Sequence, residues 1–239
     1  MQVLNSLDIF SDLPSFIRYL FVVSAGNLVA YYFLMALDLP LPKKILVHNF
    51  IMMKDGKMSK SKGNVVYPEK LISRYGVDAT RYFLLREMQT SQDGLYTPES
   101  FIERYNSDLC NDLGNLVNRT VSMVNKYFEG NVPEYNGTPN EVDKEFEEFT
   151  NSQIKKVEKL IDKYEIADAL KELWVLISRT NKYIDETRPW ELVKNEEKEK
   201  LESSIYHLIE NIRKIGIILI PFMDDTAKNL LRQIGATEE

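Results

Sequence analysis

The sequence has few of the residues that build covalently linked or metal-stabilised folds. It contains one cysteine, Cys110, and two histidines, His48 and His207, which lie far apart in the chain. A single cysteine cannot form an internal disulfide bond, and it cannot supply the thiolates of a cysteine-based zinc site. These counts exclude a disulfide-rich scaffold, predict no metal site, and favour a reducing, cytoplasmic compartment.

Glycine and proline are also scarce, with ten and nine residues among 239, which favours long helices over many short strands. The net charge of -6 argues against nonspecific binding along a nucleic acid. It still permits recognition of a few unpaired bases by local side chains. The one long apolar run, residues 19–36, approaches the length of a membrane span. Because Asn27 near its centre would be costly in lipid, we expect a buried segment and no stable membrane association.

The second half of the sequence has a helical repeat. Thr97 and Pro98 have the residue types of a helix start, and apolar residues then recur every three or four positions as far as Phe128, before Gly130. The turn-rich stretch "NVPEYNGTPN" follows. Further helices are predicted at about residues 141–164, 166–186, 198–219 and 224–234. Amphipathic helices joined by short links predict an antiparallel bundle.

The first half mixes short apolar runs with a basic loop. Residues 43–53, "KKILVHNFIMM", predict a strand or a strand pair. Pro68 and Gly76 have the residue types of a helix start and a helix stop, and Asp78 is the expected N-cap of the next helix. The predicted fold class is therefore mainly α, an antiparallel helical bundle with a small α/β part.

The basic loop "MMKDGKMSKSKGNVV", residues 52–66, is the most unusual stretch of the chain. Four of its residues are lysines: Lys54, Lys57, Lys60 and Lys62. Ammonium groups neutralise the phosphates of a polyanion, and flanking glycines let the backbone come close to such a ligand. The same composition also fits a solvated basic turn or a localisation-like patch, and the lysine count alone leaves these alternatives open.

The order of residues in the loop favours a phosphate-binding role over a solvated turn or a localisation-like patch. "KMSKS", residues 57–61, followed by "KGN" resembles the signature loop of class I aminoacyl-tRNA synthetases. The flanks "FLMALDLPLPKKILVHNFIM" and "QDGLYTPESFIERYNSDLCNDLGNLVNRTVSMVNKYFEG" resemble bacterial methionyl-tRNA synthetases, and the resemblance covers about residues 33–234. It implies three regions: an unmatched apolar leader (1–32), a catalytic-domain remnant with stem-contact helices (33–96), and a helical anticodon-binding domain (97–239).

The resemblance also implies a reaction, the ATP-dependent attachment of methionine to tRNA-Met. The loop would hold the phosphates of ATP, with Mg²⁺, while methionine attacks the α-phosphate to give methionyl-adenylate. Lys57 and Lys60 are the implied catalytic residues, and His48 would lie near the methionine pocket, although a lone histidine after an apolar strand is as often structural. The rest of the implied ATP loop consists of Met58, Ser59, Ser61, Lys62, Gly63 and Asn64.

A second set of implied residues would read the CAU anticodon. "NLVNR" supplies Asn115 and Arg119, which fall on one face of a helix. "RPW" supplies Pro189 and Trp190 at a predicted break between helices, where an indole can remain exposed and stack on a base. From the residues alone, packing remains the alternative role for Trp190, and it is the expected role for Trp174 and Phe128. Asn118 and Thr120 are expected to point elsewhere.

The sequence departs from the family in what it lacks. It contains no His-Ile-Gly-His-type motif, and the family's zinc knuckle is absent. Because that motif supplies half of the ATP site, we expect the isolated chain to be inactive in methionine activation. The sequence therefore supports two functions, an incomplete methionine–tRNA ligase and a catalytically dead module that binds the tRNA anticodon. A membrane-anchored helical protein is a third interpretation, which rests on the leader alone.

Overall fold

The computed structural model describes residues 25–41, 49–87, 89, 92–135 and 140–236. The chain forms two compact units, Met1–His48 and Asn49–Glu239. In the first unit, helix α2 spans Ala25–Ala36. Across the described ranges, no helix combines the length and the apolar character needed to cross a membrane. His48 and residues 1–24 of the predicted leader lie outside the described residues.

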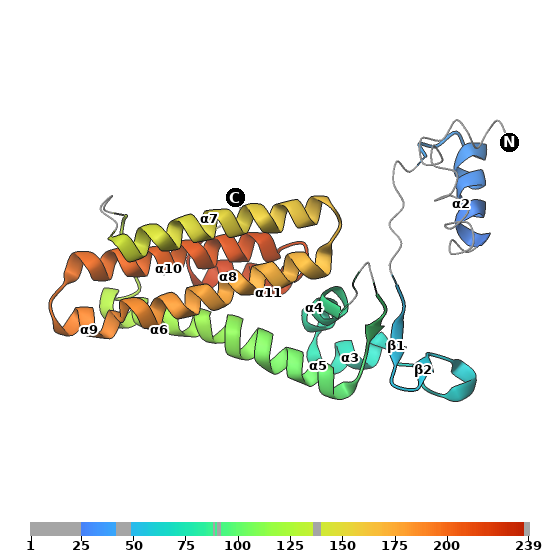
Figure 1. Ribbon diagram of the computed structural model, residues 1–239, viewed down its shortest axis with the longest axis horizontal. Helices are drawn as coiled ribbons and strands as arrows, with labels where there is room; N and C mark the ends of the chain where they lie inside the picture. The colour runs from blue at the N-terminus through green and yellow to red at the C-terminus, as the bar shows by residue number, and fades with distance from the viewer. Residues whose placement is uncertain (1–24, 42–48, 88, 90–91, 136–139, 237–239) are drawn as a thin grey trace. The chain divides into compact units, whose positions relative to one another are not determined.

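The second unit begins with a small sheet and two helices (Figure 1). Strand β1 (Ile51–Met53) pairs antiparallel with β2 (Gly56–Lys57) and parallel with β3 (Gly94–Leu95). Of the strand predicted at residues 43–53, the described part is extended only over β1, and residues 42–48 lie outside the description. Helices α3 (Pro68–Tyr75) and α4 (Val77–Glu87) follow the loop. Phe83, Tyr96 and Phe101 form a small core beside the sheet.

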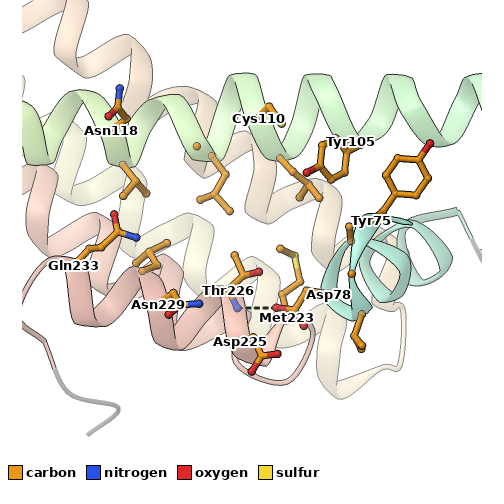
Figure 2. Close-up of a pocket in the computed structure, with 18 of the residues that line it drawn as sticks. Tyr75, Asp78, Tyr105, Cys110, Asn118, Met223, Asp225, Thr226, Asn229 and Gln233 are labelled. Atoms are coloured by element: carbon orange, nitrogen blue, oxygen red, sulfur yellow. Dashed lines mark hydrogen bonds between the residues drawn. The ribbon is translucent and has the colours of Figure 1, made fainter. Parts of the chain in front are cut away.

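The predicted limits of α3 are confirmed, but the predicted cap of α4 is wrong. Pro68 begins α3, and Gly76, with φ of 86°, ends it. Helix α4 begins at Val77, so Asp78 lies inside its first turn. The Asp78 carboxylate instead accepts a 2.6 Å hydrogen bond from the Thr226 N–H, shown as a dashed line in Figure 2. It thereby satisfies a free N–H group at the start of a distant helix, α11 (Asp224–Gln233).

The bundle contains the helices that the apolar periodicity predicts. A continuous helical segment runs through α5 (Pro98–Arg104), a wide π-helical stretch η4 (Tyr105–Gly114) and α6 (Asn115–Phe128). Thr97 caps it by accepting a hydrogen bond from the Ser100 N–H at 2.9 Å, as predicted. Helices α7 (Glu141–Asp162) and α8 (Ile166–Thr187) form a hairpin, and the short α9 (Pro189–Lys194) leads into α10 (Lys198–Leu219) (Figure 1).

The bundle core is apolar, and a fully buried carboxylate, Asp143, lies at its edge. Helices α6, α7, α8, α10 and α11 contribute its side chains, which include Trp174, and Phe128 packs against them, as predicted. Asp143, in the first turn of α7, has no exposed surface. It accepts hydrogen bonds of 2.5 Å from both the Tyr183 and the Ser203 hydroxyl groups. Asp143 therefore joins α7, α8 and α10 at the end of the bundle where α8 leads into α9.

Candidate functional site

The basic loop is an irregular extension of a two-stranded hairpin. Lys54 and Asp55 form the turn between β1 and β2, and the loop then continues through a short 3-10 helix, η3 (Lys60–Lys62). Gly56 and Gly63 have φ of 106° and 71°. Residues with a side chain rarely adopt such positive φ values, so the backbone at these two positions of the loop favours glycine.

Asn64 holds the loop closed. Its Oδ1 accepts a 2.7 Å hydrogen bond from the Ser59 N–H, and its Nδ2 donates to the Asp55 carboxylate at 2.9 Å. The same Nδ2 lies 3.4 Å from the Lys57 carbonyl oxygen. One amide thus connects the hairpin turn, the end of β2 and the start of η3. Asp55, the only acidic residue of the loop, thus has the Asn64 amide as its hydrogen-bond partner and not a lysine.

Three of the four lysines of the loop have no acidic partner among the described residues. Lys57, Lys60 and Lys62 are exposed, and within the described residues no carboxylate lies within 4.0 Å of their ammonium groups. Lys57 Nζ instead lies 4.4 Å from the centre of the Phe50 ring, a contact that orients the ammonium group without neutralising it. Lys54 lies 3.9 Å from Glu99, with both side chains largely exposed. A cluster of three free ammonium groups is suited to a polyanionic ligand.

The remaining loop residues support this arrangement. Ser59 and Ser61 share a 2.8 Å hydrogen bond between their hydroxyl groups, and Met58 is half-buried. The structure therefore brings together the whole predicted ATP loop, whereas His48 lies outside the described residues. Phe50 and Asp55 were missed, since nothing in the sequence pattern distinguishes either from an ordinary turn or strand residue.

The second predicted set begins near the middle of the long helical segment, where η4 gives way to α6. Asn115 begins α6 and is exposed, and among the described residues its side chain has no hydrogen-bond partner. Arg119, one turn further on, is half-buried and donates to the Asp185 carboxylate of α8 at 2.7 Å. Asp185 was missed by the sequence reasoning. An acidic residue in the last turn of a helix opposes the helix dipole, and that signal could have identified it.

Trp190 lies next to this ion pair in the chain, beyond a sharp break. Arg188 adopts φ of 46° and ψ of 63°, which ends α8 and starts α9 within one residue. Pro189 is buried, whereas Trp190 remains 37% exposed. The Arg119–Asp185 ion pair links α6 to the last turn of α8, five positions before Trp190. This ion pair therefore connects the helix of Asn115 and Arg119 to the end of α8, close in the chain to Trp190.

The neighbouring residues are arranged as the sequence predicts. Thr120 is fully buried. Asn118 lines a groove of about 550 Å³ between α6, α11 and the α3–α4 junction (Figure 2). Carboxylates of Asp78 and Asp225 also line this groove, so it is poorly suited to a polyanion.

Comparisons with known proteins agree with both parts. Residues 28–121 match a family model described as tRNA synthetases class I (M), and residues 132–239 match the anticodon binding domain of methionyl tRNA ligase. Curated methionine–tRNA ligases of Oceanobacillus iheyensis and Listeria monocytogenes are 53% and 56% identical to this chain over 86% of its length. The chain spans 31% of the length of each of these relatives.

Solved structures give the same result. Methionyl-tRNA synthetase of Mycobacterium tuberculosis in complex with methionyl-adenylate is 34% identical, with a TM-score of 0.77 over 86% of this chain and 41% of that chain. Its apo form has a TM-score of 0.74 at 31% identity and covers 86% of this chain and 40% of that chain. The chain therefore belongs to the methionyl-tRNA synthetase family and contains the region of that family that includes the anticodon-binding domain.

Proposed function

We propose that this chain supplies two working parts of methionine–tRNA ligation, the ATP-dependent attachment of methionine to tRNA-Met. One part is the lysine loop and the other is the corner formed by Asn115, Arg119 and Trp190. One observation carries the proposal: the same chain has an exposed lysine loop suited to phosphates and an exposed corner suited to unpaired bases. The reaction serves translation, so the proposed site of action is the cytoplasm.

The lysine loop fits the phosphates of ATP. Lys57 and Lys60 would hold them, with Lys62 and the hydroxyl groups of Ser59 and Ser61 in support. Lysine charges close to the reacting phosphate stabilise the negative charge that develops on it. Mg²⁺ usually enters such sites together with the nucleotide, bound mainly by phosphates and water. Among the described residues, no cluster of three or more histidine, cysteine or acidic side chains could hold a metal ion.

The bundle corner fits a short single-stranded sequence. The amide of Asn115 and the guanidinium of Arg119 can donate to the edges of unstacked bases, and Trp190 offers a flat face for stacking. An anticodon loop presents three unpaired bases of this kind. We therefore propose the CAU anticodon of tRNA-Met as the ligand of this corner.

A titration tests the binding part of the proposal. The purified chain is expected to bind a CAU anticodon stem-loop more tightly than a stem-loop with the same bases in scrambled order. Lys57→Ala and Lys60→Ala should leave this binding unchanged, because both lysines lie on the hairpin loop and not on α6 or α9. Equal affinity for the two stem-loops would contradict the proposal.

A second candidate function is a tRNA-binding module without catalysis, which would use the corner of Asn115, Arg119 and Trp190 alone. Methionine-dependent exchange of pyrophosphate into ATP distinguishes the two functions. We expect no exchange by the chain alone, because ATP has the lysine loop on one side and no partner motif on the other. Exchange restored when the missing region of a relative is added would favour the ligase, and exchange that stays absent would favour the module.

A further inference from the structure

The wide helical segment η4 lies directly before the residues proposed to read the anticodon. It spans ten residues, Tyr105–Gly114, and Asn115 follows it immediately. Hydrogen bonds in a π-type turn span one residue more than in an α-helix, and such turns are rare and are frequent at functional sites. Each wide turn therefore changes the direction in which the following side chains point by roughly 100° about the helix axis. The direction in which Asn115 points depends on this segment.

Side chains of α8 hold the segment in its wide form. Trp174 Nε1 donates to the Asp108 carbonyl oxygen at 3.2 Å, and Asn181 Nδ2 donates to the Asp112 carbonyl oxygen at 3.1 Å. The Asp112 carbonyl oxygen also accepts from the Asn115 N–H, so Asn181 adds a second hydrogen bond from outside the helix at the end of the wide segment. Asp185, the partner of Arg119, lies one turn beyond Asn181 on the same helix. Helix α8 thus contacts both the wide segment and the reading arginine.

Gly114 is the residue that the wide turn requires. A Cβ atom at this position would lie 3.0 Å from the Leu109 carbonyl oxygen, five residues earlier in the chain. That oxygen is the acceptor position of a π-type turn. Alanine also favours an ordinary α-helix over glycine. A substitution of Gly114 by alanine should therefore act against the wide turn while leaving the helix itself stable.

We propose that Gly114 and Asn181 are positioning residues for anticodon recognition: through the wide turn they set the direction of Asn115 and Arg119. The proposal rests on the proposed function of that corner. Neither residue has to touch the RNA. Gly114 permits the wide turn, and Asn181 holds the carbonyl group three residues before Asn115.

The test compares Gly114→Ala and Asn181→Ala with the unaltered chain in binding to two stem-loops, one with CAU and one with a single anticodon base changed. Asn111→Ala, at an exposed position of the same segment, is the matched control. Gly114→Ala is expected to weaken CAU binding about tenfold, and Asn181→Ala about fivefold, the effect of one lost hydrogen bond. Binding of the altered stem-loop should change much less, so that selectivity falls. The denaturant midpoint of Gly114→Ala should fall, because turning α6 also moves the buried Leu116 away from the core.

A measurement without RNA separates this inference from the proposed function. A chain with Cys110→Ser and Asn115→Cys has one thiol, at the exposed position 115. Tightening the turn by Gly114→Ala should rotate that thiol toward the direction of the buried Leu116 and slow its reaction with a thiol reagent by about threefold. Unchanged thiol reactivity, or unchanged selectivity in a chain that does distinguish CAU, would overturn the inference. Failure of the unaltered chain to distinguish the stem-loops would overturn only the proposed function, since the thiol measurement still decides the role of Gly114.

Discussion

Replacing Trp190 with alanine is expected to weaken binding of a CAU anticodon stem-loop by about 1–3 kcal/mol, the usual contribution of one base stacked on an aromatic side chain. The ring is 37% exposed, although its neighbour Pro189 is buried. Almost two thirds of the residue is still covered, so the substitution should also remove some packing, and binding is compared under conditions where both chains are fully folded. Titration calorimetry at one fixed salt concentration measures it, because affinities for RNA vary with salt.

Two variants serve as controls for Trp190. Trp190→Phe retains a flat ring and should lose less affinity than Trp190→Ala. Val193 lies on the same short helix and is 39% exposed, so Val193→Ala removes a comparable exposed apolar side chain without removing a ring. If Trp190→Ala binds the stem-loop as tightly as Val193→Ala does, stacking by Trp190 is excluded.

Replacing Asp143 with alanine is expected to lower the free energy of unfolding by about 3 kcal/mol. Its carboxylate has no exposed surface and accepts hydrogen bonds from the hydroxyl groups of Tyr183 and Ser203. The substitution leaves two buried hydroxyl groups without this acceptor, and each unsatisfied group costs free energy. Denaturant unfolding followed by circular dichroism gives the value. A loss no larger than that of Glu145→Ala, at an exposed position of the same helix, would contradict this role.

The same cluster predicts the response to alkaline pH. Burial, together with the hydrogen bond to Asp143, raises the pKa of Tyr183 well above its usual value. The folded chain therefore retains a proton that the unfolded chain loses above about pH 10, so stability is complete below that pH and declines as the pH rises. Tyr183→Phe keeps the ring that stacks on Phe146 at 4.1 Å but has no proton to lose. Its stability should decline less steeply above pH 10, and equal slopes would exclude Tyr183 as a cause.

The helices of the bundle were predictable because burial imposes a regular apolar spacing. Residues 198–219 were predicted as a helix and α10 spans the same residues, since its apolar positions follow the helical repeat over its whole length. The wide segment η4 was not predicted. Spacings of three and four continue through it, and the features that permit it are the missing side chain at Gly114 and two contacts from α8. Such contacts join distant parts of the chain and leave no periodic signal.

The candidate site was predictable only where its chemistry lies in consecutive residues. The lysines of the loop and the pair Pro189–Trp190 could be identified from the chain itself. The pairing of Arg119 with Asp185 could not, because the two residues lie 66 positions apart, even though the position of Asp185 in the last turn of a helix is unusual by itself. The role of Asn64 as the residue that closes the loop also depends on how the hairpin folds back on itself. The resemblance supplied the candidate residues, and the structure adds the contacts that hold them.

Helix α4 has two neighbouring aromatic residues that belong to different cores. Tyr82 packs in the large bundle core, whereas Phe83 packs in the small core beside the sheet. Separate cores can form separate cooperative units, which open locally at different free energies. The lysine loop is attached to the smaller of them, through the sheet. Local opening around the loop therefore need not expose the bundle core. Helix α4 contributes a side chain to each core, so it keeps the two cores connected.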